Sequence, residues 1–186
     1  MKSFPKISIT GDLGSGKSAV SKLLSQKLGF RIVSTGLMQR DIAARHGMTT
    51  LELNEYTKTH PEIDDEIDIR VSELQEAEES LIFDSRLAWH FAPETFKIFL
   101  TVDSDEAAKR IFNDKRKSEN YLNIEEAKQK ILARRRSELE RFKSYYNIDY
   151  SDLKNYNCVV DTTNAKPEDV CEIIINGFGK WVKTNI

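Results

Sequence analysis

Short apolar runs alternate with longer amphipathic stretches along the whole chain. The apolar runs fall at residues 7–9, 30–33, 81–84, 96–102 and 157–160, and each is typical of a buried strand. The stretches between them carry apolar residues every three or four positions, which is the spacing of helices that cover a sheet. Strands separated in this way by helices predict a parallel sheet with helices on both faces.

The segment between the second and third strands is longer than a simple crossover requires. Residues 37–46, 49–58 and a stretch that begins at Pro61 each have a helical pattern. Thr49 and Glu52 have the spacing of a capping box at the start of the middle helix. Because one helix is enough to join two parallel strands, we expect this segment to form a flap over a ligand.

Helices are also expected in the second half of the chain. The pattern predicts them over residues 105–115, over residues 124–145 and from Pro167 onward. A polar loop over residues 116–123 separates the first two. Asn123 ends this loop and is followed three positions later by a glutamate, which again indicates a capping box.

Composition narrows the class of protein. The 186 residues are 39% hydrophobic and 31% charged, which is typical of one folded domain rather than a disordered chain. The net charge of -2 argues against general nucleic-acid binding, and no apolar run is long enough to span a bilayer. We therefore expect a cytoplasmic monomer. Cys158 and Cys171 lack CxxC spacing and lie among apolar residues, so packed free thiols are expected.

A glycine-rich loop joins the first strand to the first helix, and Gly11, Gly16, Lys17 and Ser18 have the spacing of a P-loop. Glycines let successive N–H groups point inward at a phosphate, and the helix start adds a partial positive charge. We expect Lys17 to bind the β- and γ-phosphates of a nucleoside triphosphate and the Ser18 hydroxyl to coordinate Mg²⁺. The residues expected to line the nucleotide are Gly11, Asp12, Leu13, Gly14, Ser15, Gly16, Lys17, Ser18 and Ala19.

Asp84 ends the third apolar run, where a P-loop protein places its Walker B carboxylate. We expect it to hold Mg²⁺ through a water molecule, opposite Ser18. Arg86 follows two residues later and is expected to face the same cleft.

Arginines provide a further signal. Phosphoryl transfer requires cations that neutralise charge on the transferred group, and arginine binds phosphate through two parallel hydrogen bonds. An acceptor that is itself a phosphate needs no general base, which fits the three histidines lying outside any motif. Arginines in segments expected to surround the ligand are Arg40, Arg70, Arg86, Arg110, Arg116, Arg134 and Arg141.

Several other segments form a pattern that covers nearly the whole chain. They are Ser34-Thr35-Gly36 with Arg40, residues 61–70, Ser85-Arg86, Arg134 with Glu138 and Arg141, residues 146–149, and Thr162-Thr163 ahead of Pro167. Together with the P-loop, they resemble the cytidylate kinases of the nucleoside-monophosphate kinase group, in the compact form common in archaea. The chain departs from that pattern at Asp12, Gln39 and Ser85, where Pro, Phe and Gly are usual.

The resemblance implies a P-loop NTPase fold with a five-stranded parallel sheet in the order 2-3-1-4-5. It further implies that residues 1–186 form a single kinase domain with two insertions. The core would comprise residues 1–34, 80–115 and 145–186. Residues 35–79 would form the monophosphate-binding flap, and residues 116–144 the lid and the helix that follows it.

The resemblance also implies roles for individual residues in a reaction between ATP, Mg²⁺ and a nucleoside monophosphate. Lys17, Arg86, Arg116 and Arg134 would be catalytic, with Arg116 closing from the lid. Arg110, Thr162 and Thr163 would lie beside ATP, in addition to the loop. The monophosphate would contact Ser34, Thr35, Gly36, Arg40, Arg70, Arg86, Arg134, Glu138 and Arg141.

The leading interpretation is transfer of the γ-phosphoryl group of ATP to CMP or dCMP. A kinase of another small metabolite, such as dephospho-coenzyme A or a different nucleoside monophosphate, is the alternative within the same class. A GTP-dependent switch lacks the guanine-specific Asn-Lys-x-Asp motif. An RNA- or DNA-binding protein would use the basic runs at residues 109–110, 115–117 and 134–136. Because Gln39 and Ser85 depart from the pattern, the preferred base stays open.

Overall fold

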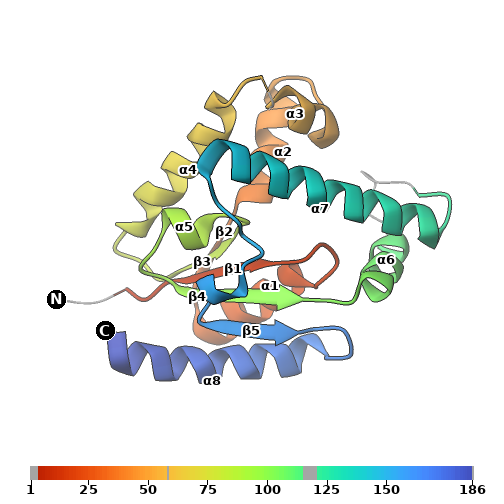
Figure 1. Ribbon diagram of the computed structural model, residues 1–186. Helices are drawn as coiled ribbons and strands as arrows, with labels where there is room; N and C mark the ends of the chain where they lie inside the picture. The colour runs from red at the N-terminus through yellow and green to blue at the C-terminus, as the bar shows by residue number, and fades with distance from the viewer. Residues whose placement is uncertain (1–3, 58, 115–120, 186) are drawn as a thin grey trace.

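The computed structural model describes residues 4–57, 59–114 and 121–185, and its centre is a five-stranded parallel sheet (Figure 1). The strands run in the order β2-β3-β1-β4-β5. This order confirms the sheet expected from the sequence. The strands are Ile7–Gly11 (β1), Arg31–Ser34 (β2), Leu81–Asp84 (β3), Phe96–Thr101 (β4) and Cys158–Asp161 (β5).

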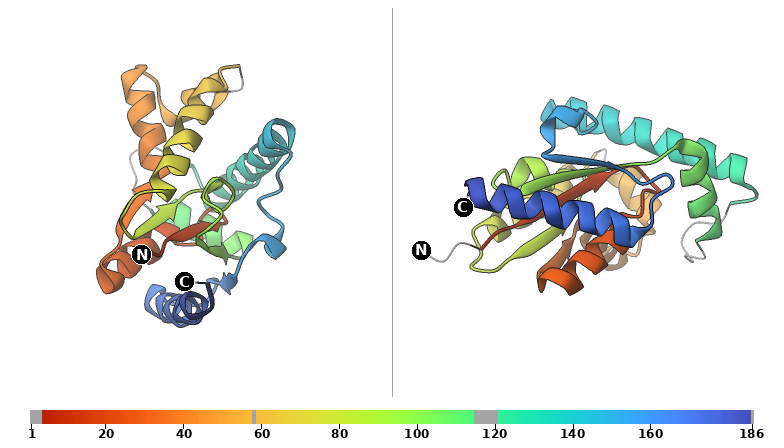
Figure 2. Two further views of the ribbon diagram at one scale, coloured as in Figure 1. Left: turned by 90° about the vertical axis from the view of Figure 1, so that its left-hand side faces the viewer. Right: turned by 90° about the horizontal axis from the view of Figure 1, so that it is seen from below.

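Two helices cover one face of the sheet, α1 (Lys17–Leu28) and α8 (Pro167–Asn185). Figure 2, right, shows both of them on the near side of the strands. Ile9 of β1 packs here with Leu24 of α1 and Ile174 of α8, and all three are fully buried. Cys171 is a buried free thiol in the same core, and Cys158 is a half-buried one in β5, as predicted.

The other face is covered by aromatic and aliphatic side chains from later in the chain. Successive strand residues point to opposite faces, so Phe83 of β3 lies in a different core cluster from its neighbour Ile82. Phe83 packs near the short helix α5 (Ala88–Phe91), and Phe99 of β4 packs with Phe142. Helix α5 was not predicted from the sequence, because a single helical turn is too short to show a periodic pattern.

Three helices lie between β2 and β3, as the pattern predicted: α2 (Thr35–Arg45), α3 (Thr50–Tyr56) and α4 (Glu62–Gln75). We call residues 35–79 the flap. It has its own apolar cluster, and in Figure 2, left, α2 and α4 rise from the sheet and diverge. Both hydrogen bonds of the capping box between Thr49 and Glu52 are present.

The boundaries of β2 and β5 differ slightly from the expected ones. Each strand begins and ends one residue later than expected. The ends shift because pairing with the neighbouring strand continues past the last apolar residue. Ser34 pairs with Asp84, and Asp161 pairs with Thr101. Strand pairing therefore places polar residues at the carboxyl edge of the sheet.

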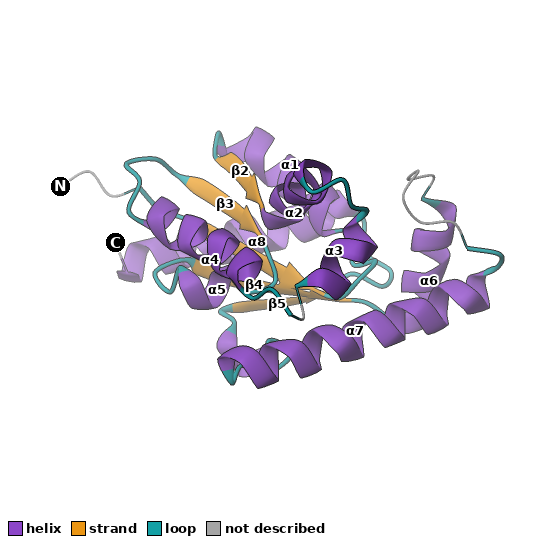
Figure 3. Cartoon of the chain, turned by 90° about the horizontal axis from the view of Figure 1, so that it is seen from above, coloured by secondary structure: helices purple, strands orange, loops and turns teal. Residues whose placement is uncertain are grey.

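Two helices complete the fold, α6 (Ser104–Asn113) and α7 (Ile124–Tyr146), followed by a 3₁₀ turn at Leu153–Asn155. Asn123 caps α7 by accepting the Glu126 N–H at 2.8 Å, as predicted. The second bond of the expected capping box differs, because the Glu126 carboxylate accepts the N–H of Leu122 at 2.6 Å. In Figure 3, α7 passes alongside the flap and the carboxyl ends of the strands. None of the helices in the described residues is long and apolar enough to cross a membrane.

Candidate active site

The loop between β1 and α1 requires glycine at specific points. Gly11, Gly14 and Gly16 have φ angles of 154°, 79° and 81°, which are unfavourable for other residues. A Cβ atom on Gly11 would lie 2.4 Å from the Leu100 carbonyl oxygen, and one on Gly14 would lie 2.8 Å from Cα of Ala107. Leu100 of β4 and Ala107 of α6 therefore leave no room for a side chain at Gly11 or Gly14. The positive φ angles of the glycines give the loop a backbone shape suited to binding an anion at the start of α1.

Lys17 lies at this helix start, and its Nζ donates to the carbonyl oxygen of Gly11 at 3.3 Å. Burial, with a further contribution from the nearby Arg86 guanidinium, lowers the pKa of Lys17 to about 7. The lysine is therefore held in a site that favours a bound anion, because negative charge would stabilise its protonated form.

Ser18 and Asp84 are brought together from α1 and the end of β3. The Ser18 hydroxyl donates to Oδ2 of Asp84 at 3.4 Å. Both supply oxygen atoms, the donors that Mg²⁺ prefers. No group of three histidine, cysteine or acidic side chains able to hold a metal occurs in the described part of the chain. The pair thus fits a magnesium ion that keeps water and substrate oxygens as its remaining ligands.

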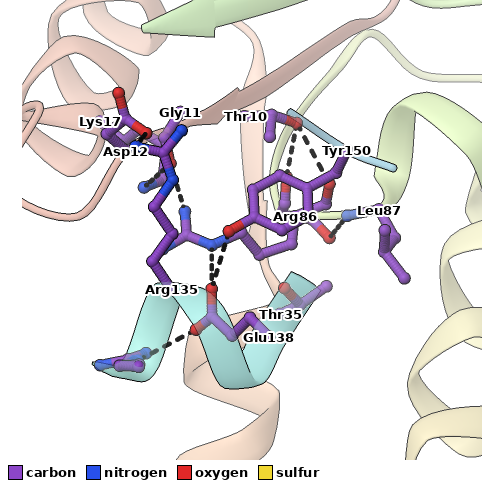
Figure 4. Close-up of polar contacts among 12 residues, drawn as sticks. Thr10, Gly11, Asp12, Lys17, Thr35, Arg86, Leu87, Arg135, Glu138 and Tyr150 are labelled. Carbon is purple, nitrogen blue, oxygen red and sulfur yellow. Dashed lines mark hydrogen bonds and ion pairs between the residues drawn. The ribbon is translucent and has the colours of Figure 1, made fainter. Parts of the chain in front are cut away.

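Arg86 lies at the centre of the polar contacts in Figure 4. One guanidinium nitrogen donates to the Gly11 carbonyl oxygen at 2.7 Å, and Nε donates to Oε2 of Glu138 on α7 at 3.0 Å. The two side chains are 16% and 13% exposed. A single, largely buried arginine therefore connects the glycine-rich loop to α7.

Glu138 has two further partners. Its Oε1 accepts from Nε of Arg134 at 3.0 Å, and its Oε2 accepts from the hydroxyl of Tyr150 at 3.4 Å. Burial alone would raise the pKa of Glu138, but the guanidinium groups of Arg86 and Arg134 outweigh it and hold the pKa at about 2. Burial, together with the charge of Glu138, raises the pKa of Tyr150 to about 12, so its hydroxyl stays a donor.

The residues expected beside ATP also lie together. Arg110 on α6 donates to the carbonyl oxygens of Thr162 and Thr163, at 2.8 and 2.9 Å. Its other terminal nitrogen is 3.4 Å from the carbonyl oxygen of Gly14. Arg110 therefore joins the segment after β5 to the glycine-rich loop.

The turn after β2 lies next to Asp84. The Ser34 hydroxyl caps α2 by accepting the Leu37 N–H, and the Thr35 hydroxyl donates to the Asp84 carbonyl oxygen at 3.5 Å. Gly36 follows in the first turn of α2, and Arg40 is exposed further along this helix. The expected acceptor segment thus begins beside Asp84.

Arg141 faces the flap rather than Glu138. Its guanidinium donates to the Thr57 hydroxyl at 2.8 Å and lies 3.4 Å from Oδ2 of Asp64 on α4. Arg134, Glu138 and Arg141 therefore lie along one side of α7, as their spacing predicted, but contact two different parts of the molecule.

Arg70 is not brought into this network. The apolar residues of α4 point toward the core, which leaves Arg70 at the helix surface, paired with Glu73 at 3.2 Å. It lines a groove between α2 and α4 instead. Arg116 lies outside the described residues.

Residues 6–164 match the model of the cytidylate kinase-like family. The chain belongs to the cytidylate kinase-like family. The cytidylate kinase of Sulfolobus acidocaldarius is 38% identical over 172 residues, covering 91% of this chain and 92% of that protein. The cytidylate kinase of Methanobrevibacter smithii is 36% identical over 169 residues, covering 91% and 95%.

One relative of this cytidylate kinase-like chain carries a different name. The S-adenosylmethionine-dependent nucleotide dehydratase of Lacinutrix mariniflava is 34% identical over 178 residues, covering 94% of this chain but 36% of that protein. Among solved structures, an uncharacterized protein from Eubacterium ventriosum has a TM-score of 0.71 at 17% identity, covering 94% and 98%. Shikimate kinase from Bacteroides thetaiotaomicron has a TM-score of 0.62 at 15% identity, with the same coverage. These two structures support the fold alone.

Several residues that contact the site or α7 were not assigned a role from the sequence. Tyr150, Asp64 and Asp68 are examples, and Asp68 accepts a hydrogen bond from the Tyr146 hydroxyl. Burial raises the pKa of Asp68 to about 6. The signal available was that Asp64 and Asp68 each follow an apolar core residue of α4, and so lie beside its buried stripe.

Proposed function

We propose that this chain transfers the γ-phosphoryl group of ATP to CMP or dCMP. Family membership and cytidylate kinase relatives that align over nine-tenths of the chain support this activity. The observation that carries the proposal is the position of Arg86 between the Gly11 carbonyl oxygen and Glu138. Arg86 joins a loop suited to a polyphosphate to a helix that carries further cations, as expected where two phosphates must meet.

On the donor side, N–H groups of the glycine-rich loop and Lys17 would bind the phosphates of ATP. Arg110, Thr162 and Thr163 would lie beside the adenine. Ser18 and, through water, Asp84 would hold Mg²⁺, which supplies neutralisation of charge on the β- and γ-phosphates when bound. The 3.4 Å separation of the Ser18 and Asp84 oxygens supports this assignment.

On the acceptor side, Arg40, Arg86 and Arg134 would bind the phosphate of the monophosphate. Its oxygen is already anionic, so the attack needs no general base. The cations would stabilise the charge that develops during transfer. Ser34, Thr35, Gly36, Glu138 and Arg141 would lie around the sugar and base.

We further propose that the flap and the lid that precedes α7 close over the two substrates and exclude water, which suppresses ATP hydrolysis. Arg116 would contribute from the lid, and Arg70 would act only if the flap moves. Because one chain supplies both halves of the site, a monomer suffices. Nucleotide substrates support a cytoplasmic location without nucleic-acid or membrane partners.

The test is release of ADP, measured by a coupled assay with ATP, Mg²⁺ and CMP or dCMP. We expect turnover with these acceptors, and a loss of several orders of magnitude in the variant Lys17→Ala. No turnover with CMP and dCMP, combined with turnover of another acceptor, would overturn the proposed substrate. Full activity of Lys17→Ala would overturn the assignment of the glycine-rich loop as the phosphate site.

A further inference from the structure

Asp12 places a carboxylate in the loop that, under the proposed function, surrounds the phosphates of ATP. Its side chain is only 12% exposed. One oxygen, Oδ2, accepts the backbone N–H of Val102 at 3.3 Å. The other, Oδ1, lies 3.2 Å from the guanidinium group of Arg135 on α7 (Figure 4). Both contacts draw the carboxylate toward the end of β4 and toward α7.

Arg135 is the residue that compensates the charge of Asp12. Oδ1 is buried and accepts no hydrogen bond within the described residues. A buried carboxylate without a partner is costly, and beside a polyphosphate it would also repel the ligand. The Arg135 side chain is 42% exposed, so water weakens the attraction within the pair. We therefore expect the pair to contribute little to the stability of the fold. Its effect is to fix the position of the Asp12 carboxylate.

The surroundings of Asp12 limit the screening of its charge by water. A small cavity next to it is lined mainly by apolar groups, among them Leu13, Ile131 and Leu132. Fewer water molecules at this point leave a larger effective interaction between Asp12, Arg135 and any nearby phosphate. Without the charge of Arg135, the Asp12 carboxylate would therefore repel a phosphate bound at the donor site.

We propose that Arg135 is a positioning residue for the donor site, which neutralises Asp12 and holds its carboxylate away from the phosphates of the bound nucleotide. Arg135 lies one turn of α7 before Glu138, which bonds to Arg86. The glycine-rich loop is thereby joined to α7 at two neighbouring points. This inference rests on the proposed ATP site but not on the identity of the acceptor.

Binding of ADP with Mg²⁺, measured by calorimetry on the full chain without any acceptor, tests the proposal. We expect Arg135→Gln to raise the dissociation constant about tenfold, because it leaves Asp12 uncompensated. Asp12→Asn keeps an acceptor for the Val102 N–H but removes the negative charge, so it should bind ADP more tightly than Arg135→Gln does. The double variant should bind like Asp12→Asn, since removing the carboxylate removes the repulsion. Arg136→Gln, an exposed neighbour on α7, is the matched control.

The following outcomes would overturn the inference. Arg135→Gln could bind as well as Arg136→Gln, which would mean that the charge of Asp12 does not affect the donor site. The double variant could bind as weakly as Arg135→Gln, which would mean that Arg135 acts on the nucleotide directly or through the fold. Thermal unfolding of each variant distinguishes a direct effect of Arg135 on the nucleotide from an effect through the fold. Wild-type protein that binds no ADP would overturn the proposed function together with this inference, whereas CMP turnover with equal affinities in all variants would overturn the inference alone.

Discussion

Arg86 and Glu138 are 52 positions apart in the sequence, yet they form an ion pair of 3.0 Å that is largely shielded from solvent. The same guanidinium donates to the Gly11 carbonyl oxygen. Glu138 therefore fixes the direction in which Arg86 presents its remaining N–H groups. This makes Glu138 a positioning residue for an arginine that we assign to the phosphate of the acceptor monophosphate.

The variant Glu138→Gln should lower kcat/KM for CMP by about tenfold to a hundredfold. The loss corresponds to one charge-assisted hydrogen bond, worth about 1.5–3 kcal/mol. Steady-state kinetics with varied CMP measures the change, and Glu140→Gln, an exposed glutamate two residues later, is the control. Equal kinetics in the two variants would show that Glu138 does not position Arg86.

The variant Asp84→Asn should raise the Mg²⁺ concentration needed for half-maximal activity by about tenfold, because a neutral amide holds a metal-bound water less strongly than a carboxylate does. Titration with Mg²⁺ at saturating ATP and CMP measures this, and removal of Mg²⁺ with a chelator should abolish wild-type activity. Asp105→Asn removes an exposed carboxylate on α6 and serves as the control. An unchanged Mg²⁺ requirement in Asp84→Asn would contradict the metal assignment.

Asp68 should make the stability of the protein depend on pH. Burial raises the pKa of Asp68 from 3.8 to about 6, so the folded chain favours its protonated form. Its contribution to the free energy of unfolding is thus fully present below about pH 4 and is lost as the pH rises through about 6. At pH 7.5, Asp68→Asn should be more stable than wild type by about 1 kcal/mol, after allowance for the partial exposure of the side chain.

Urea denaturation at pH 4 and at pH 7.5 measures the effect. Between these two pH values, the free energy of unfolding should change less in Asp68→Asn than in wild type. Glu62→Gln removes an exposed carboxylate from the same helix, α4, and should keep the wild-type difference. The Tyr146 hydroxyl remains a donor in this range, because burial and the hydrogen bond to Asp68 raise its pKa. A variant Asp68→Asn that is less stable than wild type at pH 7.5 would contradict the argument.

The sheet and the glycine-rich loop could be predicted from the sequence because their signals are local. The apolar runs predicted the strands. The spacing of Gly11, Gly16, Lys17 and Ser18 predicted the glycine-rich loop. Ser18 and Asp84 could be paired in advance, since parallel strands bring the loop and the end of β3 to the same edge. These parts depend on backbone topology rather than on side-chain packing.

The partners of the α7 side chains could not be predicted. Helical spacing placed Arg134, Glu138 and Arg141 on one side, but the tilt of α7 decides which part of the molecule each one contacts. The contact between Arg135 and Asp12 depends on the same packing. Arg70 was assigned to the acceptor on the resemblance, whereas the orientation of α4 in this structure places it on the surface.

Competition between acceptors in one reaction tests the central claim most directly. Wild-type protein, limiting ATP and Mg²⁺ are incubated with equal concentrations of CMP, dCMP, UMP, AMP and GMP, and the products are separated by chromatography with mass detection. The account predicts that CDP and dCDP form first and make up most of the product. Formation of mainly another diphosphate, or consumption of ATP with release of inorganic phosphate alone, would contradict it.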